Sequence, residues 1–84
     1  MAAYNSRNYG RAIVLYEKVR QQRDAPEVVK SACLYNIGYA NIKLRRFATA
    51  IIYFETYIGR PDITDCERMM AQYRLVEAKR RIGV

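Results

Sequence analysis

The chain has 84 residues, 51% of them hydrophobic, and its 15 Lys and Arg outnumber its 8 Asp and Glu, so the formal net charge is +7. This length fits one small domain, residues 1–84, and excludes a second one. The chain contains no His, which excludes His-dependent catalytic triads and His-containing zinc sites. The apolar content is too high for a disordered segment, and no apolar run approaches the ~18 residues of a membrane-spanning helix.

The first predicted helix covers about residues 9–22. Asn8 precedes it as a candidate N-cap, a position at which Asn is favoured. Apolar side chains then recur at steps of three and four residues, which predicts one apolar helix face. They are Tyr9, Ala12, Ile13, Tyr16 and Val19.

The second predicted helix starts near Pro26 and runs to about Leu44. Asp24 is its candidate cap, with Pro26 in the first turn and Glu27 at the positive end of the helix dipole. Apolar residues form two stripes along it. One stripe is Cys33, Ile37, Ala40 and Leu44, and the other is Ala32, Tyr35, Tyr39 and Ile42. Such a helix should be sandwiched, or half of it should be exposed for use.

Gly38 lies in the middle of this second helix. Gly costs about 1 kcal/mol relative to Ala inside a helix. That cost is tolerable if another helix backbone passes close by, so Gly38 predicts close helix packing.

The third predicted helix covers residues 47–58, after a short joint at Arg45 and Arg46, and is closed by Gly59 and Pro61. The fourth begins at a capping box, residues 64–67, and ends at Gly83. No segment alternates with period two over a useful length. The sequence therefore predicts an all-α fold of about four helices, and the short joints predict antiparallel neighbours.

Part of this pattern resembles the tetratricopeptide repeat, W-x2-L-G-x2-Y…A-x3-F…P. Leu34, Ile37 and Gly38 match the first cluster, and Ala50 and Phe54 match the second, while Asn41 departs at an aromatic position. The matching residues also include Tyr35, Asn36, Tyr39, Ala40, Phe47, Ile51 and Pro61.

A second, partial match precedes this repeat. Ala12 and Tyr16 correspond to Ala50 and Phe54, and Tyr9 corresponds to Phe47, in each case 38 residues apart. The standard period is about 34, so the turn near residues 24–26 carries extra residues. The resemblance implies tetratricopeptide-like antiparallel helical hairpins: one full repeat, a partial repeat before it and a closing helix. The chain is similar to segments of large bacterial scaffold and envelope-associated proteins, so a fragment of a longer repeat protein fits. The mitochondrial fission receptor family is a weaker resemblance, through residues 12–17 and 77–84.

The resemblance also implies a function, that of a protein-interaction, scaffold or adaptor module. The first helix of each tetratricopeptide pair lines a concave groove, which would place Tyr35, Asn36, Tyr39, Ile42 and Lys43 there. Tyr and Asn are adaptable binding residues, and groove Asn residues in relatives often bind a peptide main chain or a carboxylate. Arg68 and Gln72 are candidates to complete the site from the fourth helix. The net charge favours an acidic protein or peptide partner. The alternative for Tyr35 and Tyr39 is packing between helices.

Other functional classes have less support in the residues. Eight Tyr among many basic residues are compatible with single-stranded nucleic-acid binding, the alternative function, although a solvated basic surface explains the same charges. The nearest carboxylate cluster, Asp62, Asp65 and Glu67, lies at a helix start, where capping explains it. We therefore expect no enzyme, cofactor or metal site. Cys33 and Cys66 are expected to be small buried residues, which favours a reducing compartment and a cytoplasmic location; a periplasmic or membrane-associated parent protein stays open.

The fourth helix carries two apolar stripes, which predicts self-association. One stripe, Cys66, Met69, Met70, Tyr73 and Val76, is expected to cover helix three. The other stripe is then left without a neighbour, as is an edge of the first helix. That stripe is Ala71, Leu75, Ala78 and Ile82, and the edge is formed by Tyr9, Ile13 and Tyr16. We expect a homodimer or a contact with the rest of a longer protein to bury one of these edges. The alternative is a capping helix solvated by its own charges, among them Arg74 and Arg80.

Overall fold

The computed structural model describes residues 6–83, with side chains from residue 8 onward, and contains four helices in this part of the chain. They are α1 (Ser6–Arg20), α2 (Glu27–Lys43), α3 (Phe47–Ile58) and α4 (Asp65–Arg81). No strand occurs within residues 6–83. The predicted all-α class and the four helices are confirmed.

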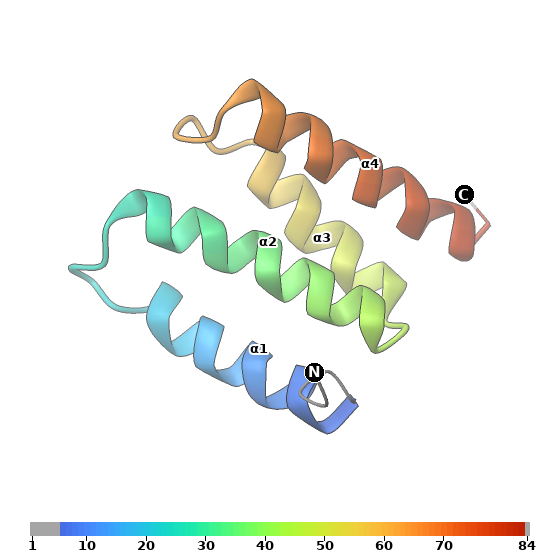
Figure 1. Ribbon diagram of the computed structural model, residues 1–84, viewed down its shortest axis with the longest axis horizontal. Coiled ribbons are helices and arrows are strands. Elements are labelled where there is room, and N and C mark those ends of the chain that lie inside the picture. Colours follow the sequence, from blue (N-terminus) through green and yellow to red (C-terminus); the bar gives the residue numbers. More distant parts are fainter. Residues whose placement is uncertain (1–5, 84) are drawn as a thin grey trace.

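Successive helices run antiparallel, so the start of α1, the turn between α2 and α3, and the end of α4 lie at the same end of the molecule (Figure 1). Each helix packs against the next one along the chain, and α2 also touches α4. The predicted sandwiching of α2 is therefore confirmed, since α1 covers one of its sides and α3 another.

The core lies between α2, α3 and α4. Its buried cluster comprises Leu34, Ala50, Phe54, Tyr57, Ile63 and Ala71. Phe54 has no exposed surface, and a Cβ added at Gly38 would lie only 3.0 Å from its ring. The close packing predicted from Gly38 is present, but an aromatic ring approaches the glycine rather than a helix backbone.

The helix ends were predicted with mixed success. At Thr64 the capping box is confirmed: the Thr64 hydroxyl accepts from the Glu67 N–H at 3.1 Å, and the Glu67 carboxylate accepts from the Thr64 N–H at 2.8 Å. The prediction for Asn8 is wrong because α1 already starts at Ser6. Asp24 is also not a cap; Pro26 occupies the N-cap position of α2 without a side-chain hydrogen bond, since proline forces the residue before it out of the helical region.

Polar contacts fasten helices that are distant in the sequence. The Tyr53 hydroxyl on α3 donates to the Glu17 carboxylate on α1 at 2.5 Å, and Arg20 donates to the same carboxylate. After α3, the Arg60 guanidinium donates to Glu27 and Ser31 at the start of α2. Contacts of this kind fix how α2 is held between its neighbours.

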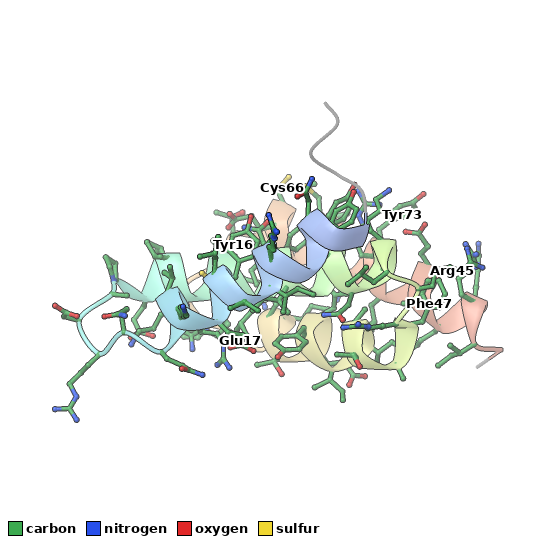
Figure 2. The ribbon with its side chains drawn as sticks, turned by 90° about the horizontal axis from the view of Figure 1, so that it is seen from below. Tyr16, Glu17, Arg45, Phe47, Cys66 and Tyr73 are labelled. Carbon is green, nitrogen blue, oxygen red and sulfur yellow. The ribbon has the colours of Figure 1, made fainter. Side chains whose placement is uncertain are left out.

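The prediction for α4 is wrong about which face is buried. Ala71 and Ala78 have no exposed surface, and Leu75 packs against the core, so these residues turn toward α3. The expected core stripe is exposed instead, and Tyr73 and Cys66 lie on the same side of the molecule (Figure 2). The physical reason is volume: the rings of Phe54 and Tyr57 already fill much of this part of the core, so the fully buried positions of α4 are the small residues Ala71 and Ala78, and the larger Leu75 is only partly buried.

Two further predictions are corrected by this packing. The expectation that Leu75 and Ala78 are left without a neighbour is wrong, because Ala78 is buried and Leu75 packs against the core, whereas Ile82 at the end of the helix is exposed. Self-association itself stays a prediction. Cys33 is buried as predicted, but Cys66 is exposed. On α1, Tyr9 is buried and Ile13 and Tyr16 are half-buried, so they do not form a free edge.

Candidate partner-binding site

The five α2 residues predicted for the groove all reach the surface. Tyr35, Asn36, Tyr39 and Ile42 are half-buried, and Lys43 is exposed. The fold places them there because the opposite side of α2 is taken up by buried residues such as Cys33 and Ile37. The sequence prediction of a Tyr- and Asn-lined face on α2 is therefore compatible with the structure.

Tyr39 is contacted by two cations from different helices. The ammonium of Lys43, one turn further along α2, lies 5.2 Å from the ring centroid. The guanidinium of Arg74 on α4 lies 5.1 Å from it. Cations at these distances are attracted by the ring quadrupole, so the ring holds both positive charges at the border between α2 and α4.

Tyr35 is a packed residue with an accessible hydroxyl. Its ring makes edge contacts with Phe54 and Tyr57, with centroids 5.3 and 5.4 Å apart. The Tyr35 hydroxyl accepts from the Arg74 side chain at 3.4 Å. This hydrogen bond raises the pKa of the Arg74 guanidinium, which stays charged. Tyr35 thus follows the alternative reading of packing between helices and also orients Arg74.

A hollow of about 260 Å³ opens beside these residues. Its lining residues come from α2, α3 and α4: Ala32, Tyr35, Asn36, Tyr57, Glu67 and Met70. Asn36 also borders a smaller hollow of about 170 Å³ between α1 and α2, together with Tyr9, Ala12, Tyr16, Tyr39 and Ala40. We call the surface formed by Asn36, Tyr39, Lys43, Met70 and Arg74 the groove.

The side-chain amide of Asn36 has no hydrogen-bond partner among the described residues. By contrast, the amide of Asn41 on the buried side of α2 donates to the Ile37 carbonyl at 2.8 Å. An amide offers both donors and an acceptor, so Asn36 is able to bind a peptide main chain or a carboxylate.

The two α4 residues predicted for the site do not reach the groove. Arg68 donates to the Ile58 carbonyl at the end of α3. Gln72 is exposed and lies with residues of the outer side of α4. Arg74 takes their place, and the sequence analysis assigned it only to solvation. The spacing of the small residues Ala71 and Ala78 marks the buried face of α4. Predicting that face correctly would have placed Arg74 toward α2.

Positive charge continues from the groove to one end of the molecule. The guanidinium groups of Arg45 and Arg81 lie 5.9 and 5.0 Å from the ring centroid of Phe47, which Figure 2 shows beside Arg45. Neither arginine forms an ion pair within the described residues. This end of the groove is therefore strongly positive.

Residues 6–83 contain neither a metal-ligating cluster nor a membrane-spanning helix. No group of three or more Cys, Asp and Glu side chains is arranged to hold a metal ion. None of the helices is both long and apolar enough to span a membrane.

Comparison of the chain with protein-family models, with curated proteins and with solved structures gave no match.

Proposed function

We propose that this chain is a tetratricopeptide-like protein-interaction module, acting as a scaffold or adaptor, which binds a segment of a partner protein in the groove. The order of the helices supports the repeat reading, since α2 and α3 carry the residues of the full repeat and the α3 residue Phe54 packs on the α2 residue Gly38. In this reading α1 is the second helix of a partial repeat and α4 is the closing helix.

The observation that carries the proposal is the unpartnered amide of Asn36 next to the cation-flanked ring of Tyr39. Both residues are half-buried, and Tyr39 packs against the core with one part of its surface while another part stays exposed. The partner would lay its main chain against Asn36 while its acidic side chains meet Lys43 and Arg74. Arg45 and Arg81 extend the same preference for negative charge.

Single-stranded nucleic-acid binding has less support in the structure. Stacking of successive bases requires several exposed aromatic faces. Among the described tyrosines, only Tyr73 is exposed, and the others are buried or half-buried. The free thiols, one of them buried, fit a reducing compartment, which supports a cytoplasmic location as part of the proposal.

Photo-crosslinking from the groove tests this function. A photoreactive amino acid at Ala32, which is exposed and lines the hollow, should capture a partner protein, and Asn36→Ala or Tyr39→Ala in the same chain should abolish the capture. The matched control places the photoreactive group at Ala48, which is exposed on α3. Equal capture from both positions, or capture of nucleic acid in place of protein, would contradict the proposal.

A further inference from the structure

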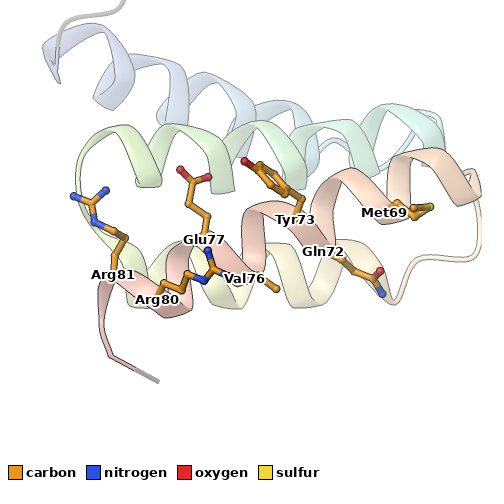
Figure 3. A pocket seen from close by; sticks show the side chains of 7 residues that line it. All are labelled: Met69, Gln72, Tyr73, Val76, Glu77, Arg80 and Arg81. Atoms are coloured by element: carbon orange, nitrogen blue, oxygen red, sulfur yellow. The ribbon is translucent and has the colours of Figure 1, made fainter.

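The outer side of α4 is an apolar surface that no part of the described chain covers. Met69, Tyr73 and Val76 have 69%, 70% and 50% of their surface exposed. Together with Gln72 and Arg80 they form what we call the outer α4 face. Figure 3 shows these side chains along the helix, with Glu77 and Arg81 at the border, and all of them come from α4.

The outer α4 face corresponds to the part of α2 that α3 covers. Both helices have 17 residues, and their first residues, Glu27 and Asp65, are 38 positions apart. The same offset relates Ala12 to Ala50 and aligns the buried residue Ala40 with the buried residue Ala78. This offset aligns Gln72 with Leu34, Tyr73 with Tyr35, Val76 with Gly38, and Arg80 with Ile42.

On α2 these four positions lie on the side that α3 packs against. Leu34 belongs to the core, Tyr35 and Ile42 pack against it, and Gly38 faces the ring of Phe54. A helix lying on the outer α4 face would meet the corresponding side of α4, but not as closely as α3 meets α2, because Val76 stands where α2 has Gly38 and a Cβ at Gly38 would lie only 3.0 Å from the Phe54 ring. Two of the α4 positions, Gln72 and Arg80, are more polar than their α2 counterparts Leu34 and Ile42, which suits an occupant that binds and leaves rather than a permanent core.

The charges around the face indicate what kind of helix fits. Arg80 lies within it and Arg81 borders it, and neither forms an ion pair within the described residues. The nearest carboxylate, Glu77, is already 3.4 Å from Arg74. An incoming helix with acidic residues beside its apolar stripe would neutralise the two free guanidinium groups.

A second copy of this chain is a poorer fit. The exposed cations Arg11 and Lys18 lie beside the exposed apolar residues of α1, which are Val14, Leu15 and Val19. Docking that surface, or a second α4, on the outer α4 face would bring like charges together, which is unfavourable.

We propose that the outer α4 face binds an amphipathic, acidic helix of a partner protein, on the side of α4 that corresponds to the α3-covered side of α2. This surface adjoins the groove, since the Arg74 guanidinium lies 5.9 Å from the Tyr73 ring centroid, but the proposal does not rest on the function assigned to the groove.

The test uses three synthetic peptides of about 20 residues, long enough to form a helix on binding, and the whole chain. The first peptide places Ala, Phe and Tyr at the spacing of Ala50, Phe54 and Tyr57 on one face, with Glu along its borders. The second has the same composition in shuffled order, and the third has Lys in place of Glu. Backbone-amide NMR shifts locate binding, and titration gives each dissociation constant.

The patterned acidic peptide should shift residues 69–80 and bind about tenfold or more tightly than the shuffled one, as expected for apolar anchors in an interface. Val76→Glu should weaken it by about tenfold, and the double change Arg80→Glu and Arg81→Glu should remove its preference over the Lys peptide. The control variants Ala48→Glu on α3 and Tyr39→Ala in the groove should leave its affinity unchanged.

Three results would overturn the proposal. Equal affinity for the shuffled acidic peptide would show attraction by bulk charge alone. Shifts confined to Asn36 and Tyr39 would place the peptide in the groove. Shifts at residues 69–80 that grow with protein concentration without any peptide, and vanish in Val76→Glu, would identify a second copy as the occupant.

Discussion

Helices α2 and α4 have the same length but very different surroundings. α2 has seven buried residues, whereas α4 has two, Ala71 and Ala78. The difference comes from position in the array, since α2 has a neighbour on each side and α4 has α3 on one side only. This difference indicates that stability is concentrated around α2 and α3. The surfaces available for recognition lie on α4 and on the face of α2 beside α4.

The largest expected effect comes from removing the ring at the centre of the core. Phe54→Ala should lower the free energy of unfolding by about 3–5 kcal/mol, since it removes a fully buried ring and leaves a cavity. Urea unfolding followed by circular dichroism measures this. Tyr73→Ala on α4 is the matched control and should cost less than about 0.5 kcal/mol. Comparable losses in the two variants would show that α4 is packed as tightly as α2.

The corresponding positions Gly38 and Val76 sharpen the comparison. Gly38→Val should destabilise the fold by roughly 1–3 kcal/mol, because the added atoms overpack the space held by the Phe54 ring. Val76→Ala should change the free energy of unfolding by less than about 0.5 kcal/mol, since Val76 is half exposed. A tolerated Val at position 38 would contradict the close approach of α3 to α2.

Much of the fold was predictable from local signals. Gly59 and the capping box at Thr64 marked helix ends, and the two apolar stripes of α2 predicted that it is sandwiched. These features depend on residues close together in the sequence, so periodicity and capping chemistry were sufficient to find them.

The orientation of α4 was not predictable in the same way. Its sequence offers one stripe of large apolar residues and one that includes Ala71 and Ala78, and hydrophobicity favours the large ones. Volume decides the outcome, because the space left beside Phe54 and Tyr57 fully buries only the small side chains Ala71 and Ala78. Because the wrong face of α4 was predicted to be buried, the contact between Arg74 and Tyr39 was not predicted. That contact follows from the orientation of α4.

A smaller effect on the free energy of unfolding is expected from removing the hydrogen bond that links α1 to α3. Tyr53→Phe removes the hydrogen bond to the Glu17 carboxylate and should cost about 1 kcal/mol, because the pair is partly exposed to solvent. Urea unfolding of this variant is the measurement. Thr49→Ser, at an exposed position on the same helix, is the control, and equal stability of Tyr53→Phe and wild type would remove the fastening role.

The same contact predicts a pH dependence. Burial opposes the charge of Glu17, but hydrogen bonds from Tyr53 and Arg20 outweigh it and hold its pKa below the ordinary value of 4.5. The stability that the folded environment of Glu17 adds is therefore complete above the ordinary pKa and is lost as the pH falls through the folded pKa. Urea midpoints of wild type and Tyr53→Phe should converge as the pH decreases below about 4. A constant difference down to the acid limit would contradict this assignment.

Binding of a partner protein in the groove is tested most directly with the partner that the photoreactive group at position 32 captures. Its affinity is measured for the Tyr39→Ala variant and for wild type. Titration calorimetry should show a loss of roughly 1–3 kcal/mol in binding free energy, the range of interface hot spots, with unchanged helicity. Ile52→Ala, at an exposed position of α3 outside the groove, should bind this partner as wild type does. Unchanged affinity in a folded Tyr39→Ala chain would contradict the account.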